Sequence, residues 1–251
     1  FQRRRSSPGA AAPGQRPRLL PADFAHRPPS PCDAASSTSR LGASTIREMP
    51  RALELFCGTQ SVGKVLKEHG WEVTSVDILP RFAPTISVDV LDWDYRGAFL
   101  PGDFDYVHIS PPCTEYSVAL RNRPRRLEEG DRLVRRALEI LEYARPRWWT
   151  IENPDALLQS RPCMEHLASH MKRVCYCKYS DGDQRWSYRK RTCIWTNLLP
   201  WVPRPMCCKK CPCEWLRDGR HLSRVTGGGR TSHLAMPPSL IHEWVGCLEA
   251  D

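Results

Sequence analysis

The sequence predicts an α/β fold built around a mainly parallel sheet, and three observations support this. Short apolar runs of strand length alternate with segments whose apolar residues recur at helical spacing. These runs end next to an acid, a glycine or a proline. The chain has 251 residues, 41% of them hydrophobic, which is enough for a sizeable core. Since no apolar run approaches the roughly 18 residues of a membrane-spanning helix, we expect no membrane partner.

The predicted elements follow one another as strands interrupted by helices. Apolar runs predict strands at residues 52–56, 72–77, 86–89, 104–110 and 148–152. Helical spacing predicts helices at residues 61–69 and 127–144. A further strand at residues 193–196 and a helix at residues 237–244 complete the set. Ligands of parallel sheets bind at the carboxyl ends of the strands, so the residues that follow each strand are the functional candidates.

Composition divides the chain into three parts. Residues 1–50 hold eight arginines, no lysine, three acids and eight prolines, and they carry +5 of the net charge of +9. Without a hydrophobic period they are predicted to be a disordered tail. The tail is a linker, an arm that binds nucleic acid, or an organelle transit peptide. Residues 51–200 are assigned to the core, and residues 201–251 to a short Cys-rich region and C-terminal helix of the same domain.

Charge and cysteine content indicate a partner and a compartment. The basic surplus favours a nucleic-acid partner. Four of the 12 cysteines crowd into residues 207–213, which is unlike a disulfide frame and favours a reducing, intracellular compartment. Cys208 and Cys211 have the Cys-x2-Cys spacing of zinc ligands, and Cys213 with His221 would complete a tetrahedral site. The alternative is a set of thiols in a loop.

The turn after the first strand suggests a nucleoside site. Residues 58–64 match most of a phosphate-binding loop, but Val65 stands where a serine or threonine must hold magnesium, which argues against an NTPase. Asp77 and Asp89 follow the second and third strands, where acids bond ribose hydroxyls. Together these features predict an adenosyl-type cofactor. Each acid is alternatively a helix cap.

A cysteine held by two prolines follows the fourth strand. Pro111 and Pro112 fix the backbone and hold Cys113 at the edge of the sheet, which favours a nucleophile over a buried structural thiol. Since the thiolate is the attacking species, we expect positive neighbours to lower its pKa. Four arginines follow within a short loop that is either solvated or binds nucleic-acid phosphates. They are Arg121, Arg123, Arg125 and Arg126.

An acid ends the fifth strand, and a second basic cluster comes later. Glu152 and Asn153 stand at the end of an apolar strand, where burial would raise the pKa of the acid and let it donate a proton. Arg189 and Arg191 precede another apolar strand. In an extended run they would point to the same face, because side chains alternate with a period of two.

In this order the residues resemble the cytosine-5 methyltransferases of DNA, in a compact form like that of some phages. The resemblance covers residues 52–197. The segments that match the motifs of the family are Glu54-Leu-Phe-Cys-Gly58, Asp77-Ile78, Asp89-Val90, Pro112-Cys113, Glu152-Asn153 and Arg189 with Arg191. It implies a class I S-adenosylmethionine-dependent methyltransferase fold, Rossmann-like, with a small Cys-rich C-terminal segment. The residues that it assigns to S-adenosylmethionine are Phe56, Gly58, Asp77, Ile78, Asp89, Val90 and Pro112.

The resemblance also implies a mechanism. A cytosine of DNA flips into a pocket, and the Cys113 thiolate attacks C6 of its ring. Glu152 bonds or protonates N3, C5 takes the methyl group, and loss of the C5 proton expels the thiolate. Arg189 and Arg191 would hold the base and the acid. We expect a monomer that lies in the nucleus or an organelle. Its expected cofactor is S-adenosylmethionine, and a structural zinc ion is a second candidate.

The chain departs from the family pattern in several places. Gln60 and Ser61 stand where the family has more glycine, Pro154 replaces a usual valine, and Ser187 a usual glutamine. The region between Trp195 and the C-terminal helix is short for target recognition, so a separate recognition chain is one option. The alternatives are a transfer-RNA cytosine-5 methyltransferase with the same catalytic set and a non-catalytic relative that binds nucleic acid.

Overall fold

The computed structural model describes residues 49–208, 213–222 and 234–250. The chain separates into two units, Phe1–Ser39 and Arg40–Asp251, and every described residue belongs to the second. The predicted tail thus lies outside the described residues except for its last two positions, and Cys211 of the predicted zinc set lies outside them as well. None of the helices in the described ranges is both long and apolar enough to cross a membrane.

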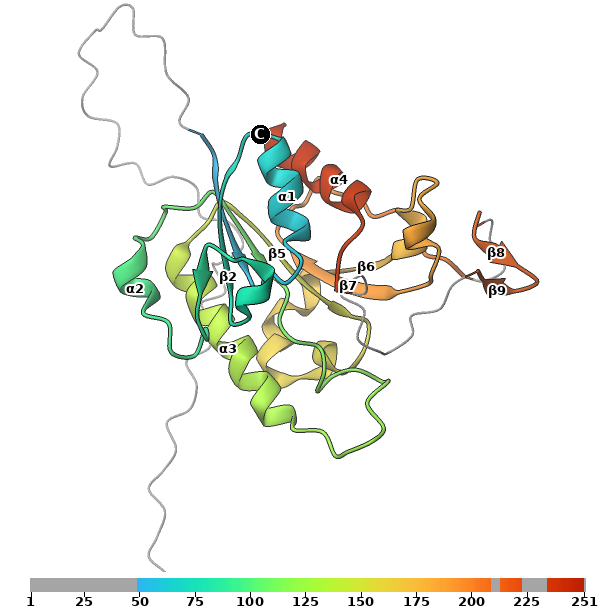
Figure 1. The fold of residues 1–251 in the computed structure, drawn as a ribbon, viewed down its shortest axis with the longest axis horizontal. Coiled ribbons are helices and arrows are strands. Elements are labelled where there is room, and N and C mark those ends of the chain that lie inside the picture. The colour runs from blue at the N-terminus through green and yellow to red at the C-terminus, as the bar shows by residue number, and fades with distance from the viewer. Residues whose placement is uncertain (1–48, 209–212, 223–233, 251) are drawn as a thin grey trace, which may run out of the picture. The chain divides into compact units, whose positions relative to one another are not determined.

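A mixed seven-stranded sheet with the order β3-β2-β1-β4-β5-β7-β6 forms the centre of this unit (Figure 1). Its strands are β1 Arg51–Leu55, β2 Glu72–Asp77, β3 Ile86–Ser87, β4 Tyr106–Ile109, β5 Trp148–Pro154, β6 Met171–Cys175 and β7 Arg191–Thr196. Strands β1 to β5 pair in parallel, whereas β7 is antiparallel to both β5 and β6. Such a sheet is typical of the class I S-adenosylmethionine-dependent methyltransferases, so the predicted fold class is confirmed.

Helices and one small hairpin complete the described fold. The α-helices are α1 Ser61–Glu68, α2 Tyr95–Ala98, α3 Leu127–Ala144 and α4 Pro238–Glu249. The 3₁₀ segments are η3 Pro80–Phe82, η4 Leu157–Ser160, η5 Pro162–His170, η6 Tyr176–Lys178 and η7 Gln184–Trp186. The hairpin pairs β8 Leu216–Arg217 with β9 Arg220–His221. Figure 1 shows α1 and α4 side by side, with α3 on the other side of the sheet.

The predicted strands and helices are present because the periodicity of their apolar residues matches the faces that the fold buries. Each predicted strand is found within two residues of its expected ends, and the helix at residues 127–144 has the expected bounds. Four of the five residues of β1 are buried, as expected of a strand covered on both faces. Helix α3 ends at Arg145, whose left-handed φ of 48° breaks the helical geometry before Pro146. The sequence pattern did not predict β6 as a separate strand, nor the β8–β9 hairpin.

The C-terminal helix packs back onto the start of the domain. Leu240, Ile241 and Trp244 of α4 are at most 1% exposed. They lie in one apolar cluster with Val62 and Leu66 of α1. Burial of side chains of this size contributes about 1.5–3 kcal/mol each. The last helix therefore stabilises α1, the element that follows the first strand.

The carboxyl ends of the parallel strands meet at one edge of the sheet. The register pairs Leu55 of β1 with Ile109 of β4, and Ile109 with Ile151 of β5. Three neighbouring strands consequently end at the same level of the sheet. This level carries the turn that begins at Phe56, the turn that begins at Ser110 and the side chain of Glu152. This edge carries the residues for which the sequence predicted a function.

Candidate active site

The turn after β1 is held by the acid at the end of β2. Phe56 and Gly58 both have left-handed backbone angles, with φ of 55° and 46°. The Gly58 N–H donates to Oδ2 of Asp77 over 2.9 Å, and the Leu79 N–H donates to Oδ1 over 2.8 Å. Both carboxylate oxygens of Asp77 thus accept a backbone N–H. In the ligand-free chain this predicted cofactor residue fixes the shape of the turn.

A cavity of about 330 Å³ lies against the same turn. Its lining residues are Gly58, Thr59, Lys64, Arg81 and Phe82. Of the predicted cofactor residues, Gly58 is in the lining. The others lie around it in different settings: Ile78 is 57% exposed, and Val90 is buried with its carbonyl accepting from Nε of Arg136. The cavity has the size of a small-molecule site.

A buried acid, Glu54, also supports this turn. The sequence placed it in a family motif but predicted no role for its side chain. Glu54 is 2% exposed and accepts from the N–H groups of Val62 and Gly63, the first turn of α1, over 3.3 and 3.1 Å. Burial raises the pKa of Glu54 to about 8, against the backbone hydrogen bonds that lower it. A Cβ on Gly63 would lie 2.5 Å from Glu54 Oε2, so this position requires glycine. The acid therefore joins β1 to α1.

The predicted nucleophile lies on a turn that a neighbouring strand holds in place. The Cys113 carbonyl accepts from the N–H groups of Tyr116 and Ser117 over 3.0 and 2.9 Å. The buried side chain of Asn153, in β5, donates from Nδ2 to the Pro111 carbonyl over 2.9 Å. The amide of the predicted Glu-Asn motif thus positions the turn that carries the cysteine.

The electrostatic setting of Cys113 differs from the expectation. Burial raises the pKa of the thiol, the charge of Glu152 raises it further, and Lys190 lowers it. The pKa of the thiol is therefore raised, whereas positive neighbours were expected to lower it. The reason is that the arginines of the exposed loop pair elsewhere, with Glu115 and the Ser117 carbonyl, whereas the half-buried thiol faces the charge of Glu152.

Glu152 is buried with two partners that the sequence analysis missed. It is 7% exposed and lies at the end of β5. The hydroxyl of Tyr176 donates to its Oε1 over 2.9 Å, and Nζ of Lys190 lies 3.5 Å from the same oxygen. Lys190 also stands over the Tyr176 ring, 4.6 Å from its centroid. These contacts fix the carboxyl group beside Cys113.

The two predicted arginines have different partners. Nε of Arg189 donates to the Cys207 carbonyl over 3.0 Å, whereas the Arg191 guanidinium pairs with Asp155 over 2.5 Å. The cation beside Glu152 is Lys190, between them. The common face of the two arginines stays a prediction.

The four arginines of the loop after Cys113 are all exposed. Arg123 donates to the Glu115 carboxylate, which lowers the pKa of that acid to about 2. The Arg126 N–H donates to the same carboxylate, and Arg125 donates to the Ser117 carbonyl over 2.9 Å. The loop is thus fastened to the turn that carries Cys113, with Arg121 exposed to solvent.

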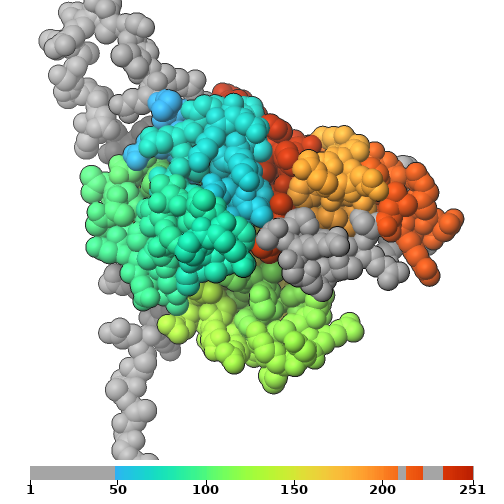
Figure 2. All heavy atoms as spheres, in the orientation of Figure 1, coloured from blue at the N-terminus to red at the C-terminus, as the bar shows by residue number. Residues whose placement is uncertain are grey.

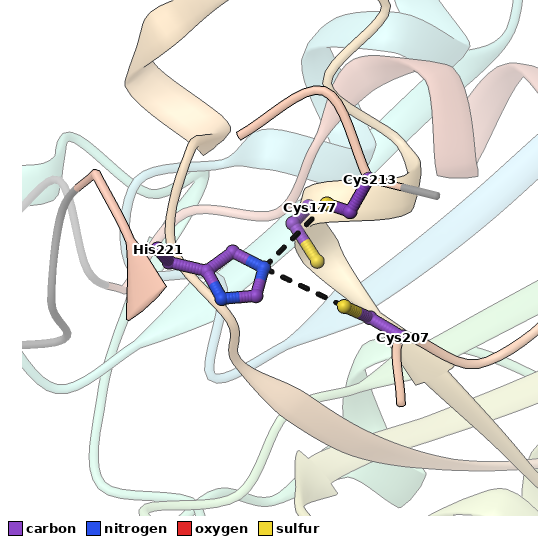
Figure 3. Close-up of side chains that lie close together, drawn as sticks. All are labelled: Cys177, Cys207, Cys213 and His221. Carbon is purple, nitrogen blue, oxygen red and sulfur yellow. Dashed lines mark hydrogen bonds between the residues drawn. The ribbon is translucent and has the colours of Figure 1, made fainter. Parts of the chain in front are cut away.

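A cluster of metal-ligand type lies in the Cys-rich region (Figure 3). Its ligand atoms, all within 4.8 Å of one another, belong to Cys177, Cys207, Cys213 and His221. Cys213 and His221 were predicted for this role, whereas Cys177 and Cys207 were not. The predicted Cys208 is exposed and outside the cluster. Neighbouring backbone positions point in different directions, so Cys207 and not Cys208 reaches the interior.

Sequence and structure comparisons place the chain among known proteins. A viral protein described as "Probable DNA (cytosine-5)-methyltransferase", from Frog virus 3 (isolate Goorha), is 34% identical over 220 residues, which cover 77% of this chain and 97% of the relative. No family model matches the chain.

Two solved structures match with lower similarity. One is described as a "putative DNA modification methyltransferase" encoded within an E. coli prophage, with 14% identity and a TM-score of 0.44 over 59% of this chain. The other is a SAM-dependent methyltransferase from Archaeoglobus fulgidus, with 20% identity and a TM-score of 0.31 over 43% of this chain. The match spans 46% of each of these solved chains. Since the viral relative is matched over almost its whole length, the chain belongs to the DNA (cytosine-5)-methyltransferase family.

Proposed function

We propose that the chain transfers a methyl group from S-adenosylmethionine to C5 of cytosine in DNA, through a covalent bond between Cys113 Sγ and C6 of the base. The observation that carries the proposal is the pairing of Cys113 and Glu152 at the ends of the adjacent parallel strands β4 and β5. A nucleophile and a proton donor on neighbouring strands can reach two atoms of one flipped base.

Cys113 acts as the nucleophile. Its thiol is neutral in the ligand-free chain because burial raises its pKa, and attack requires the thiolate. The positive charge of Lys190 favours the thiolate. The Glu152 carboxylate takes the proton that leaves Sγ and passes it to N3 of the base, so attack adds no net charge to the site.

Glu152 acts on N3 of the base. The Tyr176 hydroxyl and Lys190 occupy Oε1, which leaves Oε2 for the base. Protonating N3 lets the ring accept the bond from Sγ at C6 without building negative charge. C5 then becomes nucleophilic and takes the methyl group, with S-adenosylhomocysteine as the leaving group. Loss of the C5 proton to water as the C6–S bond breaks, and return of the N3 proton to Glu152, restore the ring and leave Cys113 as the thiolate.

The cavity after β1 is the proposed cofactor site. It is bounded by the left-handed turn that contains Gly58 and by Arg81 and Phe82 after β2. S-adenosylmethionine supplies the electrophilic methyl group there. The protein itself fixes the shape of the turn. Asp77 accepts from the Gly58 N–H, and Glu54 accepts from the N–H of Gly63 at the start of α1.

The exposed arginine loop after Cys113 is the proposed contact to DNA phosphates. All proposed catalytic groups lie on one chain, so a monomer suffices. DNA as substrate points to the nucleus or an organelle. The cysteines outside the metal-type cluster support a reducing compartment there, since Cys57, Cys113, Cys163 and Cys193 are free thiols.

The test is methyl transfer from labelled S-adenosylmethionine to DNA and, separately, to RNA. We expect label in DNA, and a covalent adduct on denaturing gels with DNA that contains 5-fluorocytosine. Cys113→Ser should lose the adduct and slow transfer by about 10³-fold or more. The matched control is Cys163→Ser, a half-buried thiol that should keep both.

Three outcomes would count against the proposal. Full activity of Cys113→Ser would exclude the covalent mechanism. Label in RNA but not in DNA would move the substrate to the transfer-RNA class. Binding of DNA without transfer to any substrate would favour the non-catalytic relative.

A further inference from the structure

Four side chains from separate segments converge on one point in the Cys-rich region (Figure 3). Cys177 comes from η6, directly after β6, and Cys207 from the segment that follows β7. Cys213 and His221 come from around the β8–β9 hairpin, with His221 in β9. We propose that these four residues bind one Zn²⁺, and that this ion holds the backbone that positions Tyr176, the partner of Glu152, and Arg189, which is predicted to hold the base.

The spacing of the ligand atoms fits a single tetrahedral ion. Nε2 of His221 lies 3.5 Å from the sulfur of Cys207 and 3.5 Å from that of Cys213. With Zn–S bonds of about 2.3 Å and a Zn–N bond of about 2.0 Å, the S···N edge of a tetrahedron is about 3.5 Å long. Three thiolates and one imidazole form a donor set that selects zinc over the harder divalent cations.

The local fold needs such an ion. The apolar cluster here is small: Cys175, Cys177 and Cys207 are buried, with Met206 and Trp215 packed at its margin. Strands β8 and β9 have two residues each, too short to be stable alone. A bound metal replaces the missing core in small segments of this kind.

Hydrogen bonds connect the same segments around the cluster. Nε1 of Trp215 donates to the Ser180 hydroxyl over 2.7 Å, and that hydroxyl donates to Glu214. These contacts join the residues after η6 to the segment before β8, the two segments that supply Cys177 and Cys213. The four ligands are therefore held near one another by a second set of contacts.

Two of the ligands adjoin residues to which the proposed function gives a role. The Cys207 carbonyl accepts from Nε of Arg189 over 3.0 Å. Cys177 directly follows Tyr176, whose hydroxyl donates to Glu152. Fixing both sulfurs on one ion fixes the backbone that carries Tyr176 and the carbonyl that accepts from Arg189. Arg189 and Tyr176 then act as positioning residues that depend on the metal, and this part rests on the proposed function.

The first experiment measures metal in the full chain, expressed with zinc and purified without chelator. Elemental analysis should give about one zinc per chain, and no iron. Chain loaded with Co²⁺ should show the thiolate charge-transfer and d–d bands of a tetrahedral site. Neither measurement depends on a variant that folds. A wild-type chain without zinc, even after addition of one equivalent, would overturn the site.

The second experiment compares Cys213→Ser and His221→Ala with Cys208→Ser. Cys208 is exposed and outside the cluster, so its variant should keep the zinc and the cobalt bands, while the other two lose them. Equal zinc loss in Cys208→Ser would contradict the assignment. For positioning, Cys213→Ser should form the 5-fluorocytosine adduct about tenfold more slowly with unchanged S-adenosylmethionine binding. If the wild type binds zinc but transfers no methyl group, the proposed methyltransferase function is wrong and the proposed zinc site is still supported.

Discussion

The strand-end edge and the Cys-rich region bring distant residues together by different physical means. At the edge, the register of β4 and β5 brings the strand ends together, and the Asn153 side chain holds the turn that carries Cys113 near Glu152. In the Cys-rich region, few backbone pairs and little apolar burial support the arrangement of Cys207, Cys213 and His221. Sheet register is a robust way to position a site, whereas the second region depends on its ligands.

The two regions meet at Tyr176 and Arg189. Tyr176 follows β6 and donates to Glu152, the proposed catalytic acid, and Arg189 precedes β7 and donates to the Cys207 carbonyl. A change in the edge should therefore affect chemistry with little loss of stability. A change in the Cys-rich region should affect stability first and chemistry through these two residues.

The largest effect is expected at the acid. Glu152→Gln keeps the shape of the group but removes the proton for N3, so methyl transfer should fall by about 10²–10⁴-fold with nearly unchanged stability. Labelled transfer to DNA and a urea melt measure the two quantities. Glu142→Gln, an exposed acid on α3, is the matched control. A Glu152→Gln chain with wild-type rates would remove Glu152 from the mechanism.

A ligand change in the Cys-rich region should act on stability instead. Cys207→Ser should lower the melting temperature by about 10 °C, since the loss of a structural metal costs several kcal/mol. Cys208→Ser should change stability by less than about 0.5 kcal/mol. Differential scanning calorimetry measures both. Equal melting temperatures for the two variants would remove the proposed contrast between the regions.

The buried acid under the first turn predicts a pH dependence. The pKa of Glu54 is about 8 in the folded chain and close to 4.5 when unfolded, so the folded state binds more protons between these values. Stability from this group is therefore full below pH 4.5 and is lost as pH rises towards 8, by up to about 1.4 kcal/mol per unit. Urea melts of the wild type and Glu54→Gln should diverge over this window, with the variant favoured at high pH. Parallel curves would contradict the raised pKa.

The smallest effect is expected at the residue shared by both regions. Tyr176→Phe removes one hydrogen bond to Glu152, so methyl transfer should fall by about tenfold. Tyr143→Phe removes a hydrogen bond to the Phe99 carbonyl, a contact between α3 and the residue after α2 that does not involve Cys113 or Glu152. Both variants should lose similar stability, and Tyr176→Phe alone should lose activity. Equal methyl-transfer activity in the two variants would mean that Tyr176 contributes to stability and does not position Glu152.

The parts of the site that the sequence predicted are those that follow a strand. Cys113, Glu152 and Gly58 were predicted because ligand-binding residues of parallel sheets lie after the strands, and the register brings these strand ends together. The neutral state of the Cys113 thiol was not predicted, because it depends on how deeply the turn is buried. The same holds for Lys190, whose contact with Glu152 forms only once the segment before β7 has packed beside β5.

The amino-acid sequence by itself determined the α/β class, the order of the strands and helices, and the residues at the strand ends, because these depend on local periodicity and short motifs. The tertiary structure alone decided that Asn153 holds the nucleophile turn, that Tyr176 and Lys190 hold Glu152, and that Cys177 and Cys207 join Cys213 and His221. These contacts join residues far apart in the chain. Spacing along the sequence carries no information about them, because they form only once the sheet and the returning segments have packed.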